Sequence, residues 1–379
     1  MRWYNLGGRR RVLFPVKVPA LGMKVLRALP QEPTPLPALP AREERVLENG
    51  RIRMEVDEAG RICSLLDKLT GYQALTEPVE LRLFADQGDS WGKRQNGWTL
   101  FEERPGLRCT EIMRTADGPI RQTLRIRMQG DCGQARWLIH LDGEDPFVQV
   151  ELQVLWLAPW HRLKLSLPVG CAVTQAEAPL GESRRPVSAE ECYMHRYVDA
   201  LRPDGSGLLC VNDGVYAFDT PADRLDVTLL RSAIYAHSNC VDWFDERDTY
   251  DHCDLGEHRY RFLLAPHGAA LTVRARRALA QRLCAPLTML GEMQHPGTVV
   301  PQGLRLSDGS VRLDAFKPAE DGGLAVRLRE VEGSACVCCV SLHDREKELA
   351  FGPYQSRTLC FRGGEWLETN MLEDVTHEP

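Results

Sequence analysis

One short segment gathers most of the side chains that could donate protons, bind a metal or hold a sugar. ERDTYDHCDLGEHRYRFLLAPH, residues 246–267, places six such residues within eight positions, ahead of an apolar run: Asp251, His252, Cys253, Asp254, Glu257 and His258. His, Cys and carboxylates are the usual metal ligands. If the apolar run is a strand, Glu257 and His258 point to opposite faces and cannot both bind one metal without a bulge. A loop-capping role and a carbohydrate-facing role therefore stay open beside the metal site.

A second polar concentration is YMHRYVDA, which contains His195, Arg196, Tyr197 and Asp199. Aromatic rings stack on sugar faces, and Arg and Asp bind hydroxyl groups, so this mixture suits a polar ligand. A strand with an exposed charged face explains the same residues.

A third is the Gly-rich segment ADQGDSWGKRQNGW, which carries Asp89, Trp91, Asn96 and Trp98. Polar, Gly-rich segments form loops, and binding sites are often built on loops. The alternative is a turn whose Trp91 is tucked into the core. The chain has no GxxxxGK[ST] phosphate loop and no HExxH helix, so those chemistries are not expected.

Composition narrows the class of protein. The 379 residues are 43% hydrophobic and 26% charged, with a net charge of −6, which predicts two or three domains with real cores. No basic face is evident, so we expect neither nucleic acid nor an anionic membrane as partner. No window approaches the roughly 20 apolar residues of a membrane helix.

The 13 cysteines are scattered, odd in number and not accompanied by a secretory signal, which predicts a reduced, cytoplasmic protein. Three of them lie in SACVCCVSL, which reads as a buried strand using cysteine as a small apolar residue: Cys336, Cys338 and Cys339. Because alternate strand residues face opposite sides, we expect no metal site there.

The elements that position these residues are almost all strands. Period-two runs recur at NGRIRMEV, RICSLLDKLTG, RQTLRIRMQG, ARWLIHLDG, FVQVELQVLWL, HRLKLSLPV, GSGLLCVNDGVYAFDT, RLDVTLLRSAIY and HRYRFLLAPH. The first two, joined by DEAG, predict a hairpin that turns at Gly60. The persuasive helix candidate is LTVRARRALAQRLC, ended by Pro286. This pattern predicts an all-β protein of the sandwich type.

Four regions follow along the chain. Residues 1–29 contain a strand that turns at Gly22 and resumes as a second strand, residues 30–45 are a Pro-rich extended connector, residues 46–285 form a large β-domain, and residues 286–379 form a smaller β-sandwich.

The ordered landmarks of this sequence resemble the C-terminal region of the family 38 glycoside hydrolases, the retaining α-mannosidases. They are LENGRIRMEVDEAGRICSLLDKLTG, GDSWG, LKLSLPV, NDGVYAFD, LLRSAIYAH, DLGEHRYRFLLAPH, KPAEDGGLAVRLRE and NMLE. Each motif alone is weak, but their order and spacing extend the resemblance from about residue 12 to the C-terminus. The resemblance implies a galactose-mutarotase-like stack of antiparallel sheets followed by a small β-sandwich.

The resemblance also implies that catalysis belongs to an N-terminal barrel, which carries the zinc ligands and the aspartate nucleophile, and that this chain starts after it. We therefore expect no catalytic residue, no metal and no cofactor here. We expect instead residues at the rim of a mannoside site: Asp89, Trp91, His195, Arg196, Tyr197, Asp251, Glu257 and His258.

The function that follows is a non-catalytic β-domain of an α-mannosidase-like hydrolase. The alternatives are a free-standing carbohydrate-binding module and a mutarotase-like sugar enzyme, which would need a convergent histidine and carboxylate. A missing barrel also predicts an exposed apolar patch, with Val12, Leu13, Phe14, Val16 and Val18 as contributors. Through it the chain would self-associate or bind a separately encoded catalytic polypeptide.

Overall fold

The computed structural model describes residues 2–4, 11–26, 43–86, 89–90, 102–235, 250–291, 303–320 and 322–375. In these residues the chain forms strands joined by short connections, one 3-10 turn, η2 (Pro221–Asp223), and one α-helix, α1 (Val273–Cys284). The chain divides into two compact units, Ala38–Pro286 and Met1–Pro37 with Leu287–Pro379. The predicted all-β class, built from stacked antiparallel sheets, is confirmed.

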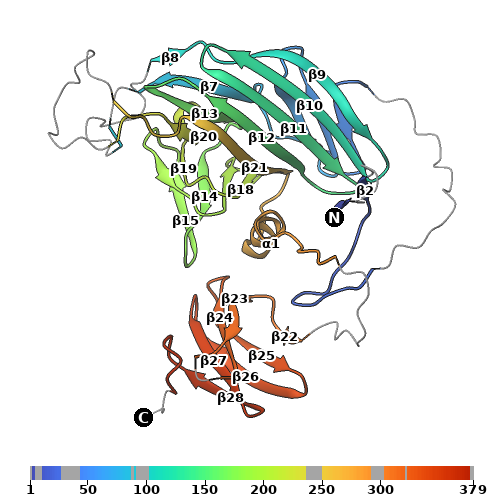
Figure 1. The fold of residues 1–379 in the computed structure, drawn as a ribbon, viewed down its shortest axis with the longest axis vertical. Helices are drawn as coiled ribbons and strands as arrows, with labels where there is room; N and C mark the ends of the chain where they lie inside the picture. The colour runs from blue at the N-terminus through green and yellow to red at the C-terminus, as the bar shows by residue number, and fades with distance from the viewer. Residues whose placement is uncertain are drawn as a thin grey trace. The chain divides into compact units, whose positions relative to one another are not determined.

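The largest sheet of the Ala38–Pro286 unit has nine antiparallel strands (Figure 1). In spatial order they are β15 (Glu182–Pro186), β14 (Val173–Glu177), β17 (Tyr197–Leu201), β18 (Gly207–Asn212), β21 (Gly256–His267), β12 (Val148–Trp156), β11 (Gly133–Asp142), β10 (Arg121–Gly130) and β9 (Arg108–Asp117).

The two halves of this sheet differ in how they are covered. Along β12 every second residue is buried, which is the pattern of a strand with one face on the core. Strands β17 and β18 are buried at every position, because α1 packs on their second face. There Leu209 and Val211 of β18 cluster with Ala280 and Leu283 of the helix.

Two further sheets close the core of this unit. The six-stranded sheet consists of β16 (Cys192–Tyr193), β19 (Ala217–Asp219), β20 (Arg224–Arg231), β13 (His161–Pro168), β7 (Glu80–Ala85) and β8 (Glu103–Arg104). The four-stranded sheet consists of β3 (Val46–Glu48), β4 (Ile52–Val56), β5 (Ile62–Asp67) and β6 (Tyr72–Gln73). Inward-facing residues of all three sheets form one apolar cluster, including Met54, Ile126, Leu165 and Phe262.

The hairpin predicted at the start of the large β-domain is confirmed as β4 and β5. Its turn closes with a hydrogen bond from the Gly60 amide to the Asp57 carbonyl oxygen, 3.1 Å long. Gly60 has a φ of +74°, a conformation that residues with a Cβ atom rarely adopt. The DEAG segment therefore turns where the sequence indicated.

Helix α1 confirms the predicted helix. Thr272 caps its first turn by accepting a hydrogen bond from the Ala275 amide at 3.1 Å, and the helix ends at Cys284, two residues before Pro286. In the described part of the chain, no helix has the length and apolar character that crossing a membrane requires.

The other unit contains two small sheets and a strand pair. One sheet consists of β22 (Leu304–Leu306), β25 (Cys336–Leu342) and β26 (Arg345–Phe351), and the other of β23 (Val311–Pro318), β24 (Leu324–Glu330), β27 (Ser356–Arg362) and β28 (Glu365–Thr369). Strands β1 (Arg2–Tyr4) and β2 (Arg11–Leu13) form the pair. The cysteine-rich segment is a strand as predicted, with Cys338 fully buried in an apolar core.

The strand predicted before Gly22 ends early, and the strand predicted after Gly22 is not formed over residues 23–26, the part of it that the structure describes. Strand β2 ends at Leu13, and the described residues that follow, up to Leu26, form no named strand. Pro15 and Pro19 supply no backbone N–H, so the alternating apolar pattern cannot continue a ladder through them. The Pro-rich connector lies almost entirely outside the described residues.

Candidate functional site

Loops at one end of the larger unit come together in what we call the loop cluster: residues Asp86, Asp89, Ser90, Trp160, Arg231–Tyr235 and Tyr250–Asp254. Isolated bridges pair Ile234 with Asp89 in parallel and with His252 in antiparallel orientation. The Cys253 amide donates to the Ala233 carbonyl oxygen at 2.9 Å. The structure thus places two of the predicted rim residues, Asp89 and Asp251, in one cluster although 162 positions separate them in the sequence.

Arg231, the last residue of β20, holds these loops together. Its Nε and Nη2 atoms donate to the Asp86 carboxylate at 2.5 and 3.0 Å, and its Nη1 donates to the Asp89 carbonyl oxygen at 2.7 Å. Its backbone amide donates to a carboxylate oxygen of Asp254 at 3.0 Å. One residue therefore holds three aspartates, from two segments, through charge-assisted hydrogen bonds.

The carboxylate at the centre of this arrangement is shared by a second arginine. Arg162 of β13 donates from Nη2 to Asp86 at 3.0 Å, and both side chains are completely buried. Burial lowers the pKa of Arg162 to about 10, and the negative charge of Asp86 acts against that shift. Arg162 therefore stays charged at neutral pH, and Asp86 is an anchoring carboxylate between two cations.

An aromatic group lies beside this anchor. The Trp160 ring meets His252 edge-on, with ring centroids 4.8 Å apart, and Tyr250 at 6.1 Å. Trp160 has a φ of +61°, which is uncommon for a residue with a large side chain. Hydrogen bonds hold its backbone: its amide donates to the Ser232 carbonyl oxygen at 2.8 Å, and its carbonyl oxygen accepts from the Asp86 amide at 2.7 Å.

The solvent side of the loop cluster combines polar and aromatic groups. Asp251 is exposed, and the Tyr235 side chain is 60% exposed. The Nδ1 atom of His252 lies 2.9 Å from the Ser232 carbonyl oxygen; a carbonyl only accepts, so Nδ1 carries the proton and Nε2 is left as an acceptor in the neutral ring. Such a surface can bind hydroxyl groups and the apolar face of a sugar ring.

Glu257 and His258 begin β21 and point to opposite faces of the sheet, as expected for adjacent strand residues. Glu257 pairs across the ladder with Leu155 and is exposed, whereas His258 pairs with Val154. The Nε2 atom of His258 donates to the Asp254 carbonyl oxygen at 2.8 Å, so this imidazole supports the turn that leads into the strand.

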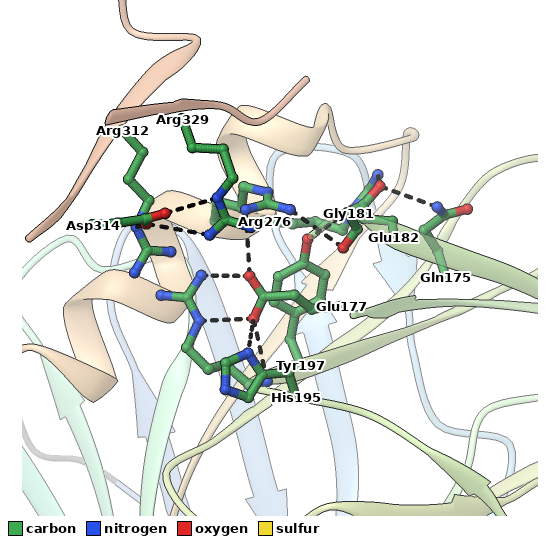
Figure 2. A network of polar contacts seen from close by, with 12 residues as sticks. Gln175, Glu177, Gly181, Glu182, His195, Tyr197, Arg276, Arg312, Asp314 and Arg329 are labelled. Atoms are coloured by element: carbon green, nitrogen blue, oxygen red, sulfur yellow. Dashed lines mark hydrogen bonds and ion pairs between the residues drawn. The ribbon is translucent and has the colours of Figure 1, made fainter. Parts of the chain in front are cut away.

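The predicted rim residues 195–197 lie in a different place, under helix α1 (Figure 2). Arg196 grips the Glu177 carboxylate through Nε, at 2.7 Å, and through Nη2, while Arg277 of the helix lies 3.5 Å from it. Burial acts to raise the pKa of Glu177, but the hydrogen bonds and charge of Arg196, with the charge of Arg277, outweigh it and hold the pKa below its usual range.

A second arginine–glutamate pair of this kind lies on the neighbouring strand. Arg276 donates from Nε and Nη2 to both carboxylate oxygens of Glu182 at 2.8 Å, and Figure 2 shows Gln175 and the hydroxyl of Tyr197 converging on the same group. Burial raises the pKa of Tyr197, and the charge of Glu182 adds to that shift. Arg276 and Arg277 thus fasten α1 to the sheet.

This placement separates the predicted rim residues into two groups. The backbone amide of Asn212 donates to the Arg196 carbonyl oxygen, and Asn212 pairs with Phe262 of β21. Phe262 lies six residues along β21 from Gly256, the strand's first residue after the loop cluster. The two groups are therefore about 20 Å apart along this strand. Tyr197 is fully buried and Arg196 is engaged with Glu177, whereas the His195 side chain is 50% exposed, 3.7 Å from Glu177.

Trp91 lies outside the described residues, so its rim role stays a prediction. Sequence reasoning missed the residues that organise the loop cluster: Asp86, Trp160, Arg162 and Arg231. Asp86 lies beside the motif GDSWG and Arg231 lies within LLRSAIYAH. A single Asp or Arg at the end of a strand, however, gives no local signal that the two side chains form an ion pair. Among the described residues, no group of three or more His, Cys, Asp or Glu side chains is arranged to hold a metal.

The fold and the loop cluster define a two-unit antiparallel β-sandwich protein, and solved structures share this fold. An alpha-mannosidase from Enterococcus faecalis V583 matches with a TM-score of 0.68 and 16% identity, covering 83% of this chain and 42% of that chain. A glycosyl hydrolase family 38 protein from Enterococcus faecalis matches with a TM-score of 0.70 and 16% identity, covering 83% and 43%. At this identity the likeness concerns the fold alone.

The sequence specifies the family. The profile described as "Glycosyl hydrolases family 38 C-terminal domain" matches residues 47–239, just over half of the chain, and the chain belongs to this family. Alpha-mannosidase 2C1 from Homo sapiens is 24% identical over 326 residues, and the Mus musculus protein of that name is 23% identical over 367 residues. These matches cover 78% and 83% of this chain but 29% and 33% of the relatives, so the chain spans about a third of their length.

Proposed function

We propose that this chain is an accessory β-domain of an α-mannosidase-like glycoside hydrolase. In this role it contributes to assembly and forms part of the rim of a carbohydrate site, and it does not hydrolyse glycosides by itself. The observation that carries the proposal is the loop cluster, in which exposed Asp251 and Tyr235 sit on loops that Arg231 and Asp86 anchor from below.

The chemistry of the loop cluster suits sugar recognition. Carboxylates accept hydrogen bonds from hydroxyl groups, and aromatic rings cover the C–H face of a pyranose. Because the ion pair that anchors the loops is buried, the exposed groups are not needed to hold the loops in place. The rim of a binding site requires such a fixed geometry, with polar atoms that can bind a ligand.

The non-catalytic part of the proposal rests on the family resemblance, which assigns the nucleophile and zinc to a barrel whose landmarks are not among those that this sequence matches. Within the loop cluster, Asp86 is not available as a nucleophile, because two guanidinium groups neutralise its buried carboxylate. A retaining glycosidase requires instead a pair of carboxyl groups about 5 Å apart, one free to attack and one to donate a proton.

A hydrolysis assay tests this part directly. The purified chain is incubated with 4-nitrophenyl α-mannoside, and we expect no release of 4-nitrophenol above the buffer rate. Release that disappears in an Asp251→Ala variant would overturn the non-catalytic assignment.

Titration calorimetry with mannose and mannobiose tests the rim. Tyr235→Ala and Asp251→Ala should weaken any binding, whereas Tyr216→Ala should not, because Tyr216 is equally exposed at 61% but is not part of the loop cluster; its carbonyl oxygen accepts from the Met194 amide. Binding that appears only with a catalytic polypeptide present supports the accessory role. Binding by the chain alone favours the alternative, a free-standing carbohydrate-binding module, because the exposed groups of this chain would then be sufficient to bind the sugar.

The assembly part of the proposal concerns residues 11–26. Leu13, Phe14, Val16 and Val18 are half-buried, while the residues after them expose apolar side chains: Leu21, Met23, Val25 and Leu26. We propose that this apolar stretch contacts a second copy of the chain or the catalytic polypeptide. Light scattering after gel filtration checks it, and a monomer whose mass and elution are unchanged by Met23→Ser and Val25→Ser, with and without that polypeptide, would count against it.

We also propose a reducing, cytoplasmic location. The support is that all twelve cysteines among the described residues are free thiols. Thiol titration of protein purified without reductant and unfolded in guanidinium should count 13 free thiols, the number of cysteines in the sequence.

A further inference from the structure

Ser232 lies where the apolar core of the larger unit meets the loop cluster, and its side chain is completely buried. The hydroxyl oxygen accepts hydrogen bonds from the Trp156 Nε1–H at 3.1 Å and from the His161 amide at 3.1 Å. The hydroxyl donates to the Ala158 carbonyl oxygen at 2.5 Å, and the His161 carbonyl oxygen lies 3.0 Å away. A hydroxyl has one proton and two lone pairs, so every hydrogen-bonding position of this group is occupied.

The backbone of Ser232 bonds to the same turn. Its amide donates to the His161 carbonyl oxygen at 2.8 Å, and its carbonyl oxygen accepts from the Trp160 amide at 2.8 Å. The connection between β12 and β13 is therefore folded around one residue. The same carbonyl oxygen accepts from Nδ1 of His252 at 2.9 Å, so Ser232 also joins this turn to the segment that carries Asp251.

These bonds hold Trp160 in an unfavourable backbone conformation. Its φ of +61° lies in the left-handed region, which costs free energy for a residue with a Cβ atom and persists only where neighbouring groups determine it. Ser232 bonds to its amide, to the Ala158 carbonyl oxygen before it and to the His161 amide after it. The turn that results places the Trp160 ring 4.8 Å from the ring of His252.

The exposed groups of the loop cluster depend on the same residues. Ile234 forms a bridge with His252, and the Tyr235 amide donates to the Asp251 carbonyl oxygen at 3.3 Å. Asp251 and Tyr235 are each next in sequence to a member of that bridge. A displacement of His252 therefore displaces both groups that the proposed function assigns to the sugar.

Satisfying the core explains only part of this arrangement. The buried indole N–H of Trp156 requires one acceptor, which the Ser232 oxygen provides. The further bonds of that hydroxyl, to Ala158 and His161, hold the turn and not the core.

We propose that Ser232 is a positioning residue of the carbohydrate rim. Its hydroxyl fixes the turn at Trp160, and through the Trp160 and His252 rings it holds the exposed groups of the loop cluster in place. The inference rests on the proposed function, and its two measurements distinguish a failure of one from a failure of the other.

The test compares Ser232→Ala with Ser166→Ala. Ser166 of β13 is also buried, and its hydroxyl donates to a carboxylate oxygen of Asp226 at 2.6 Å. Each variant loses one buried hydroxyl group, but the Ser166 hydroxyl bonds to Asp226 and not to the turn. Circular dichroism verifies that both variants are folded.

Fluorine NMR of the chain labelled with 5-fluorotryptophan measures the placement of Trp160 without any sugar. The Trp160 signal, assigned by its loss in Trp160→Phe, should move in Ser232→Ala and keep its wild-type position in Ser166→Ala. If the Ser232 hydroxyl contributed to stability alone, the folded Ser232→Ala chain would keep the wild-type Trp160 signal.

Titration calorimetry with mannobiose connects the turn to the rim. Ser232→Ala should bind mannobiose about fivefold more weakly than the wild type, and Ser166→Ala should bind it equally well. The comparison uses the condition in which the wild type binds, either alone or with the catalytic polypeptide.

An unmoved Trp160 signal in folded Ser232→Ala overturns the inference, and so does a moved signal with unchanged mannobiose affinity. A wild type that binds no mannobiose in either condition refutes the proposed rim, and the NMR comparison then still decides whether Ser232 fixes the turn. If Ser232→Ala does not fold, Ser232→Cys takes its place with the same outcomes, because a thiol is a weak donor and acceptor.

Discussion

Replacing Arg231 by Met should destabilise the larger unit far more than removing a surface arginine. Arg231 is 16% exposed and makes two hydrogen bonds to Asp86, whose carboxylate is completely buried. Methionine keeps the length of the side chain but removes its charge. Deleting one partner of a buried pair costs about 3–5 kcal/mol. Arg162 still neutralises Asp86, so we expect the lower end, a loss of about 3 kcal/mol in the free energy of unfolding.

The matched control is Arg261→Met. Arg261 also pairs with an aspartate, Asp213, at 2.5 Å, but it is 45% exposed, so its loss should cost less than about 1 kcal/mol. Urea unfolding at pH 7, followed by circular dichroism, gives both values from shifts in the midpoint at constant slope. A loss for Arg231→Met below 1 kcal/mol, or equal to that of Arg261→Met, refutes the anchoring argument.

Three further outcomes follow from buried charge and from backbone geometry. Burial, opposed by the charge of Lys164, raises the pKa of Asp219 from 3.8 to about 6. Between these values the native chain holds a proton that the unfolded chain has released, so wild-type stability falls as pH rises. Relative to wild type, Asp219→Asn should gain about 2 kcal/mol between pH 4 and pH 7 in urea unfolding. Gly133→Ala places a Cβ atom 2.0 Å from a carbonyl oxygen and should cost about 3 kcal/mol or more, whereas Gly71→Ala, with no atom within 4 Å, should cost about 1 kcal/mol by the same measurement. Arg276→Met removes the clamp on α1 and should lower unfolding free energy by about 3 kcal/mol, with faster amide exchange in the helix.

Most of the fold could be predicted because its signals are local. Alternating apolar residues set the strand faces, and turn chemistry set the ends of the β4–β5 hairpin. Thr272 and Pro286 bracket the only long helical pattern, and α1 lies between them. These features depend on residues within a few positions of one another, so the sequence contains the information needed to predict them.

The first segment shows where that reasoning fails. Its apolar residues alternate as in a strand, but Pro15 and Pro19 interrupt the row of donors, and β2 ends at Leu13. Periodicity records which side chains could share a face. It does not record whether the backbone between them can supply the donors of a ladder.

The candidate site divides in the same way. The polar density of residues 251–258 was visible in the sequence, and part of it does belong to the loop cluster. The residues that give the cluster its geometry were not visible, because the Asp86 and Arg231 side chains meet across 145 positions. The YMHRYVDA segment had an equally promising composition, yet burial under α1 commits Arg196 and Tyr197 to packing.

Both places use arginine and carboxylate pairs that are buried, but for different ends. Under α1, arginines bind the carboxylates of Glu177 and Glu182, and these ion pairs hold the helix on the sheet. In the loop cluster, Arg162 and Arg231 bind the carboxylate of Asp86. The outer residues, Asp251 and Tyr235, take no part in that anchor. Composition cannot separate these cases, since each supplies Arg, an acid and an aromatic ring. What separates them among the described residues is that α1 covers the charged layer under it, whereas Asp251 and Tyr235 are exposed, and this is why we place the proposed ligand surface at the loop cluster and not at YMHRYVDA.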